Sequence, residues 1–229
     1  MNRILSYFTK FEIWLWSISV FSILISFCIF DRENYLTLIA SIIGATFLIL
    51  NAKGNPIGQI LTIVFCLLYG VISYGFSYYG EMVTYLGMSM PMALLALISW
   101  LKNPYEKGKM EVKVNKISKK EVLFMTFLSV VVTVVFYYVL KHFNTANLIP
   151  STLSVTTSFI AVYLTFRRSP YFALAYASND LVLIILWVLA TKTQLSYLSV
   201  VICFIVFFVN DLYGFVNWKR MEEKQRKNI

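Results

Sequence analysis

The sequence is poor in charge. Only 14% of its 229 residues are Asp, Glu, Lys or Arg, whereas about a quarter of a soluble domain is charged. Because 59% of the residues are hydrophobic, a soluble fold of this chain would need a charged shell that so few side chains cannot supply. This shortage excludes an ordinary cytosolic enzyme and requires a lipid bilayer as the solvent for most of the chain.

Residues that carry catalysis or bind metals are also scarce. The three cysteines, Cys28, Cys66 and Cys203, each lie inside an apolar run, so neither a disulfide framework nor a zinc site is expected. His142 stands beside Lys141 at the end of an apolar run. The sequence contains no phosphate-binding loop and no nucleophile paired with a base. We therefore expect a protein that is not an enzyme and that uses no cofactor and no metal.

Long apolar runs are abundant. Eight runs approach or exceed the roughly 20 residues that a helix needs to cross about 30 Å of hydrocarbon. They leave no room for a second, soluble domain. The predicted spans are 12–30, 35–50, 56–78, 82–101, 121–141, 149–166, 170–190 and 194–216.

The basic residues sort to one side of these spans. All but three of the 20 Lys and Arg residues fall on one side, and the exceptions are Arg32, Lys141 and Lys192. Basic loops are retained in the cytoplasm, so both termini are predicted to be cytoplasmic and the number of spans even. The same sorting explains the net charge of +9 without nucleic acid as a partner.

Two parts of the chain resemble each other in layout. Each has a short basic turn that ends in proline, at Pro56 and Pro170, and each closes on a tryptophan, Trp100 or Trp218. This pattern predicts a duplicated three-helix unit with parallel repeats and a substrate path between them near the bilayer midplane. The predicted parts are a leading helix (12–30), a first three-helix bundle (35–101), a cytoplasmic loop with a linker helix (102–141) and a second three-helix bundle (149–218).

Two acidic residues fall inside the predicted spans. Asp180 and Asp211 each follow an asparagine, Asn179 or Asn210. A charge at the centre of a membrane helix costs about 2.5–3.5 kcal/mol on insertion scales and is usually functional. At 1.5 Å per residue, Asp180 lies about 15 Å into its span, near the midplane. Trp187, two turns later on the same face, is either an aromatic wall above Asp180 or a residue of the interfacial belt.

The first three-helix bundle offers fewer polar candidates. Gln59 lies near the cytoplasmic end of its span, where it either contacts a substrate or reaches toward the membrane surface. Tyr69 is either a stacking surface or a packing residue. These alternatives stay open from the residues alone.

The C-terminal part of the last span carries a motif. The string Asn210-Asp-Leu-Tyr213-Gly-Phe-Val-Asn-Trp218 resembles the Asn-x-x-Tyr-Gly-x-x-x-Trp ending of the PnuC family of bacterial vitamin transporters. The stretch from Tyr79 to Met82, with Trp100 after it, is similar to the matching part of the family's first bundle. The stretch from Asp180 to Trp187 resembles a family Asn-x6-Trp pattern.

This resemblance implies an all-α membrane protein of about eight transmembrane helices with a SWEET-like fold. It implies a homotrimer in the bacterial cytoplasmic membrane, in contact with lipid. The implied function is facilitated diffusion of nicotinamide riboside, an NAD precursor. Asp180 in place of the family's Asn, and an apolar residue near Phe65 where Asn is expected, leave thiamine, riboflavin or a deoxynucleoside open as substrates. A non-transporting scaffold and proton coupling through Asp180 are further alternatives.

The substrate-binding hypothesis combines these observations. Polar contacts are assigned to Asn179, Asp180 and Asn210, and ring stacking to Trp187 or Tyr213. The remaining candidates are Asp211, Gln59, Tyr69 and Trp100.

Overall fold

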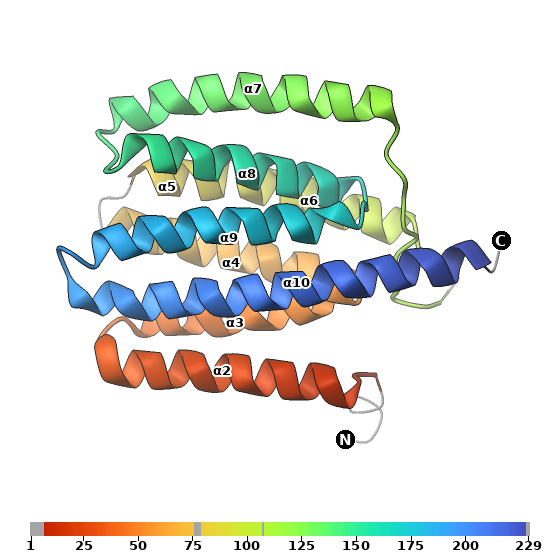
Figure 1. Cartoon of the computed structure of the whole chain (residues 1–229), viewed down its shortest axis with the longest axis horizontal. Coiled ribbons are helices and arrows are strands. Elements are labelled where there is room, and N and C mark those ends of the chain that lie inside the picture. Colours follow the sequence, from red (N-terminus) through yellow and green to blue (C-terminus); the bar gives the residue numbers. More distant parts are fainter. Residues whose placement is uncertain (1–6, 76–78, 107, 228–229) are drawn as a thin grey trace.

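The computed structural model describes residues 7–75, 79–106 and 108–227 and is built of helices lying side by side along one axis (Figure 1). In this described part, eight helical segments are long and apolar enough to cross a membrane, which confirms the prediction of eight spans. The elements are α2 (Lys10–Phe30), α3 (Tyr35–Ala52), α4 (Pro56–Gly75), α5 (Tyr79–Thr84), the π-helix η1 (Tyr85–Ser89), α6 (Met90–Lys102), α7 (Lys119–His142), α8 (Leu148–Phe166), α9 (Tyr171–Ala190), the 3₁₀-helix η2 (Leu195–Tyr197) and α10 (Leu198–Lys227).

The ends of the second, third and last predicted spans can be compared with the ends of the helices. The short second segment is an 18-residue helix, two residues longer than predicted. The predicted end of the third segment at Tyr78 lies outside the described residues. The predicted last span ends at Val216, whereas the helix α10 continues to Lys227. No proline or glycine interrupts residues 217–227, and the Gln225 side chain in this extension is bound by the 103–118 connection.

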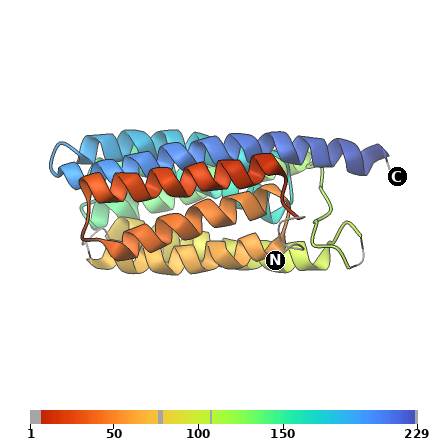
Figure 2. The same ribbon diagram turned by 90° about the horizontal axis from the view of Figure 1, so that it is seen from below.

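Six of the helices form two facing rows (Figures 1 and 2). One row holds α3, α4 and α6, and the other holds α10, α9 and α8. At one edge α3 packs against α10, and at the other α6 packs against α8. The helix α2 covers the α3–α10 edge, and α7 covers α8 on the opposite side of the bundle. The helices α4 and α9 are thus the middle helices of their rows, and each keeps an exposed apolar face on the outside of the bundle, with Val71 of α4 61% exposed and Ile185 of α9 57% exposed.

The two ends of the bundle differ in charge. At the basic end lie the α3–α4 and α8–α9 turns with Lys53, Arg167 and Arg168, the Lys-rich 103–118 connection, and the extension of α10. The N- and C-terminal parts of the chain lie at this same end (Figure 1). The distal end carries the connections 31–34, 143–147 and 191–194. The bundle therefore has the charge asymmetry of a membrane protein with one preferred orientation.

The turns α3–α4 and α8–α9 have the same hydrogen bonds at the same spacing. Gly54 N–H donates to Asn51 C=O at 2.9 Å, and Arg168 N–H donates to Thr165 C=O at 3.0 Å. Gly54 and Arg168 both have a positive φ, +63° and 55°. Glycine adopts this left-handed conformation without strain, whereas arginine must be held in it. Arg168 is held by bonds from its guanidinium to Ser99 Oγ (2.6 Å) and Lys113 C=O (3.1 Å).

Two buried tryptophans join the rows at the basic end. Trp100 of α6 donates to Thr165 C=O of α8 at 2.9 Å, and Trp218 of α10 donates to Asn51 C=O of α3 at 2.8 Å. Each row thus supplies one indole to the first helix of the other. The two rings lie 5.4 Å apart and are fully buried. Their packing closes the basic end of the space between the rows.

The 103–118 connection crosses the basic end and binds both repeated turns. Val112 N–H donates to Gly54 C=O, and Asn115 N–H donates to Arg168 C=O, both at 3.0 Å. The Val112 side chain is fully buried. Burial and the neighbouring Arg167 lower the pKa of the Arg168 guanidinium from its ordinary value. The side chain still carries its charge, because arginine is not deprotonated in proteins. The connection therefore fixes the two turns relative to each other.

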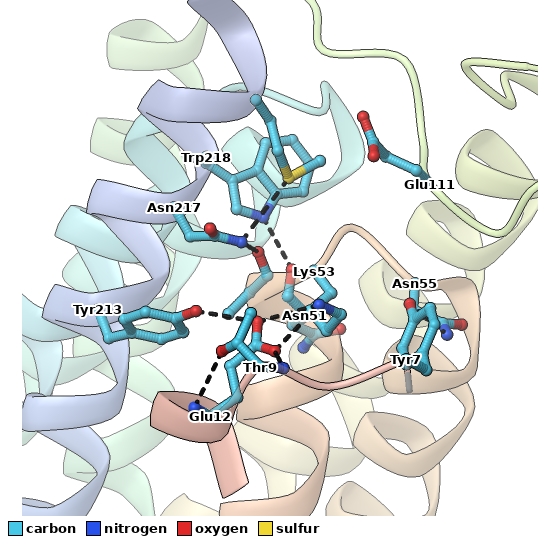
Figure 3. A network of polar contacts seen from close by, with 12 residues as sticks. Tyr7, Thr9, Glu12, Asn51, Lys53, Asn55, Glu111, Tyr213, Asn217 and Trp218 are labelled. Carbon is cyan, nitrogen blue, oxygen red and sulfur yellow. Dashed lines mark hydrogen bonds and ion pairs between the residues drawn. The ribbon is translucent and has the colours of Figure 1, made fainter. Parts of the chain in front are cut away.

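The leading helix α2 is anchored by a polar network (Figure 3). The Glu12 carboxylate is buried and lies 3.0 Å from the Lys53 ammonium of the α3–α4 turn. It also accepts a bond of 2.9 Å from the Tyr213 hydroxyl of α10. Thr9 caps α2 through a reciprocal capping box with Glu12. One carboxylate thus joins α2 to one helix of each row.

We predict that Glu12→Gln destabilises the protein in detergent by about 2 kcal/mol, because it leaves a largely buried ammonium without its counter-charge. For a chain of this size this corresponds to a melting temperature lower by roughly 5 °C. Adding Lys53→Met should restore part of the loss, since the unpaired charge is then removed. Glu33→Gln, an exposed change at the distal end, is the control. Equal melting of the Glu12 and Glu33 variants would contradict the anchoring role.

Candidate functional site

A cavity of about 70 Å³ lies between the rows, with α4 and α9 on opposite sides of it. We call it the central cavity. Its wall is formed by residues of α3, α4, α8, α9 and α10 and by two residues of the π-helix η1, which precedes α6. The lining residues are Phe47, Leu48, Asn51, Thr62, Phe65, Cys66, Tyr85, Ser89, Ser158, Phe172, Tyr176, Asn179, Asp180, Leu183, Phe204, Phe207 and Asp211.

Two carboxyl groups face this cavity from adjacent helices. Asp180 of α9 and Asp211 of α10 are each only 4% exposed, and their side chains lie within hydrogen-bonding range of each other. Asp180 Oδ2 has no hydrogen-bond partner among the described residues. A buried carboxyl oxygen without a partner is costly, so this atom is available to a ligand.

Amide side chains flank the acidic pair. Asn179 lines the cavity beside Asp180, and its Oδ1 accepts a bond of 2.9 Å from the Thr157 hydroxyl of α8. At the basic end of the cavity, Asn51 Oδ1 accepts a bond of 2.9 Å from Gln59 Nε2. Gln59 does not itself line the central cavity, and it acts by fixing the orientation of Asn51.

Most of the remaining wall is aromatic. Rings in van der Waals reach of one another cover the α3, α4 and α10 sides, with Phe47–Phe65 centroids at 5.3 Å and Phe65–Phe207 centroids at 6.1 Å. Phe172 and Tyr176 of α9 complete the wall toward the basic end. Aromatic walls around a few fixed polar groups are typical of sites for flat organic ligands.

A second cavity, which we call the distal cavity, leads from the central cavity toward the distal end. The two cavities share Tyr85, Ser89, Ser158 and Leu183 in their walls. Trp187 lies on the distal side, where it lines this cavity and two neighbouring cavities. Tyr69 lines the distal cavity as well, with its ring 4.7 Å from that of Tyr85.

The residues shared by the two cavities depend on an irregular helix. Tyr85 and Ser89 bound the π-helix η1, where Met90 N–H donates to Tyr85 C=O five residues earlier. The next residue, Pro91, has no N–H to continue the regular helical pattern. Single π-turns inside α-helices occur frequently at functional sites. Here the wide turn places a hydroxyl at each of its ends in the passage between the cavities.

The basic end of the central cavity is closed. Phe172 packs against Trp218 with ring centroids 4.9 Å apart and against Trp100 at 6.4 Å. Both indoles are bound to backbone carbonyls, so they are fixed in place. In this structure the chain of cavities therefore leads from the acidic pair toward the distal end.

The structure brings only some of the predicted site residues together. Asn179, Asp180 and Asp211 line the central cavity, and Tyr69 and Trp187 line the distal one. Gln59 and Trp100 line neither cavity. Gln59 binds Asn51, and Trp100 binds the backbone of α8.

Asn210 and Tyr213 face α2 instead of the cavities. Asn210 Nδ2 donates to Ser19 Oγ at 2.9 Å, and Tyr213 donates to Glu12. These two residues are three positions apart and share one side of α10, and Asp211 points about 100° away from Asn210 and about 160° away from Tyr213. Both contribute to the packing of α2.

Several lining residues were not singled out from the sequence. Tyr176 lies one helical turn before Asp180 on the same face of α9, so this spacing could have predicted that Tyr176 lines the same cavity as Asp180. Tyr85, Ser89 and Ser158 had no comparable signal, because their place depends on the π-turn and on the packing of α8. The described residues contain no group of three His, Cys, Asp or Glu side chains that could hold a metal ion.

Comparison with known proteins gives the family. The family model described as nicotinamide mononucleotide transporter matches residues 34–220. The chain belongs to this family of membrane transporters. The resemblance to PnuC proteins is thereby confirmed, as is the prediction that the protein is a transporter and not an enzyme. The matched range begins just before α3, so the leading helix α2 lies outside it.

Two curated relatives of this transporter and one solved structure extend the comparison. The nicotinamide riboside transporter PnuC of Neisseria mucosa is 26% identical over 221 residues, which cover 94% of this chain and 83% of the relative. The protein of the same description from Haemophilus influenzae is 21% identical, covering 84% and 82%. The crystal structure of the vitamin B3 transporter PnuC has a TM-score of 0.82 at 22% identity and covers 95% of this chain and 94% of that one. The fold is therefore that of PnuC.

The chain offers its own probe of the central cavity. Cys66 and Cys203 are both buried, but Cys66 lines the central cavity and Cys203 belongs to the apolar core around α10. We predict that a small water-soluble methanethiosulfonate modifies Cys66 at least tenfold faster than Cys203, because reaction requires access to water. The rates are measured in Cys28→Ser/Cys203→Ser and Cys28→Ser/Cys66→Ser proteins. Faster modification of Cys203 would show that the described cavity is not the solvated path.

Proposed function

We propose that this transporter carries nicotinamide riboside across the bacterial cytoplasmic membrane by facilitated diffusion, with its basic end in the cytoplasm. The observation that carries the proposal is the pair Asp180–Asp211 facing an aromatic cavity midway along the bundle. Nicotinamide riboside contains a positively charged aromatic ring and a sugar with hydroxyl groups. Both curated relatives are named for this molecule.

The chemistry of the cavity suits such a substrate. A pyridinium ring brings a positive charge to two buried carboxyls, where the low dielectric strengthens the attraction. The surrounding rings add stacking and a cation–π attraction of about 2 kcal/mol when desolvated. Asn51 and Asn179 are hydrogen-bonding groups of the kind that binds a ribose. Thiamine is also an aromatic cation, whereas riboflavin and deoxynucleosides are neutral and would leave the acidic pair uncompensated.

The duplicated architecture supports a path between the rows. The matching turns and the reciprocal Trp100 and Trp218 bonds are those expected of two three-helix units related by an axis along the membrane normal. We therefore propose the arrangement of one leading helix followed by three, one and three helices. In such a protein, alternating access requires the two three-helix units to move relative to each other around the fixed site between them.

We also propose a homotrimer in contact with lipid. The outermost helix α7 exposes apolar side chains along most of its length, including Leu123, Phe127 and Tyr138. This surface needs lipid or a neighbouring subunit to cover it. The mass of the complex in native mass spectrometry from lipid nanodiscs measures the number of subunits.

Uptake into proteoliposomes tests the transport function. We predict saturable uptake of labelled nicotinamide riboside that is competed by the unlabelled compound and is unaffected by an imposed pH gradient. Riboflavin and deoxynucleosides should compete poorly, because they are neutral. Uptake driven by the pH gradient would instead favour proton coupling through Asp180. If none of these compounds shows saturable uptake, the alternative of a non-transporting scaffold is favoured.

The role of charge is tested by comparing two forms of one ligand. Reduced nicotinamide riboside, a dihydropyridine, has nearly the same shape without the positive charge. We predict that Asp180→Asn weakens the binding of nicotinamide riboside at least tenfold, about 1.4 kcal/mol or more, and that of the reduced form less than threefold. Tyr213→Phe, on the α2 side of α10, is the control and should leave both affinities unchanged. An equal loss for both forms would show that Asp180 is structural.

A further inference from the structure

An acidic residue of the distal cavity has no part in the central site. Glu81 lies in the first turn of α5, near the distal end. In the sequence it lies directly before the predicted span 82–101. In the structure it lines the distal cavity and both neighbouring cavities. It therefore stands where these three spaces meet.

The packing of the preceding residue determines this position. A Cβ atom at Gly80 would lie 2.3 Å from Thr145 Oγ1 and 2.5 Å from a methyl carbon of Leu140. Only glycine lets α5 approach the α7–α8 corner so closely. This approach brings Glu81 into the two cavities that Thr145 and Ser151 also line, the distal cavity and one of its neighbours.

Polar groups around Glu81 are left without partners. Glu81 itself makes no hydrogen bond or ion pair with another described residue. Ser73, which lines one of the neighbouring cavities with Glu81, is 1% exposed, and its hydroxyl has no partner in the described structure. The residue Thr145 is partly exposed, but its hydroxyl oxygen is buried and also has no partner among the described residues. Buried hydroxyls without partners beside a free carboxylate indicate a site that is completed by a ligand.

Aromatic rings line the same cavities as this carboxylate. Tyr69 and Tyr85, with ring centroids 4.7 Å apart, line the distal cavity together with Glu81. Trp187 lines the distal cavity and both neighbouring cavities, and its ring lies 5.3 Å from that of Tyr197. A carboxylate and aromatic rings in one cavity are the groups that bind organic cations.

Hydroxyl groups line the same distal cavity. Ser151, Ser154 and Ser158 lie on one face of α8 at helical spacing, and all three line the distal cavity. With Thr84 of α5 they form a row of hydrogen-bonding groups that runs toward the central cavity, since Ser158 belongs to both. A sugar with several hydroxyls can exchange partners along such a row.

We propose that Glu81, Tyr69, Tyr85 and Trp187 form a second binding site for an aromatic cation, which the substrate occupies before it reaches the Asp180–Asp211 pair. The inference rests on the proposed function, since the substrate must be positively charged. The carboxylate at this site raises the local concentration of the cation and guides it inward. Glu81 therefore governs capture, whereas Asp180 and Asp211 hold the substrate in the central cavity.

The test measures initial uptake rates in proteoliposomes over a range of substrate concentrations, for nicotinamide riboside and for its reduced, uncharged form. We expect Glu81→Gln to raise KM for nicotinamide riboside five- to tenfold with kcat unchanged, and to leave KM for the reduced form within twofold. Glu81→Asp keeps the charge and should restore most of the lost capture. Glu33→Gln, the same chemical change at an exposed distal position, is the matched control.

The outcomes separate the two proposals. Saturable uptake by the unsubstituted protein together with equal KM values for the Glu81→Gln and Glu33→Gln proteins would overturn the distal site and leave the proposed function standing. Equal effects of Glu81→Gln on both forms of the substrate, with a lowered melting temperature, would assign Glu81 a structural role and also overturn it. No saturable uptake by the unsubstituted protein would overturn both proposals.

Discussion

The cost of burying carboxyl groups in a membrane is the constraint on which this structure depends. Asp180 and Asp211 lie near the centre of a bundle whose exterior is apolar, and one oxygen of the pair lacks a partner within the described chain. Such groups are retained where a ligand or water meets them. The aromatic rings and amides around the pair limit which ligand can do so, and an aromatic cation satisfies both the charge and the shape.

The rest of the bundle closes this pair off at the basic end. There, Trp100 and Trp218 are bound to backbone carbonyls of the opposite row, and the 103–118 connection binds both repeated turns. The wall of the distal cavity is richer in hydroxyls than that of the central cavity. Movement of one row relative to the other would break the two indole bonds together, because each crosses between the rows. The reciprocal bonds thus couple the closure of the basic end to the arrangement of both units.

The composition and the apolar runs were enough to predict the membrane environment and the eight spans, because roughly 20 apolar residues in succession have few other structures open to them. Asp180 could be placed in the site from depth alone. The direction in which a side chain points could not be predicted in the same way. Asn210 and Asp211 are adjacent in sequence, yet one faces α2 and the other the cavity, and only the packing of α2 against α10 decides between them.

Irregular backbone accounts for the remaining differences. Tyr85 and Ser89 reach the passage between the cavities because Pro91 interrupts the regular helix, and the resulting π-turn rotates the residues before it. Trp100 belongs to a motif shared with the family, and its buried bond to Thr165 gives it a role in joining the rows. Glu81, directly before a predicted span, lines a cavity because Gly80 permits a close helix contact.

A structure determined with nicotinamide riboside bound tests the central claim most directly. The positively charged ring should lie between α4 and α9, within about 4 Å of a carboxyl oxygen of Asp180 or Asp211, which is the distance of an ion pair. The ribose should lie near Asn51 or Asn179. Substrate found outside the space between the two rows, or in the central cavity with its ring turned away from both carboxyls, would contradict the claim.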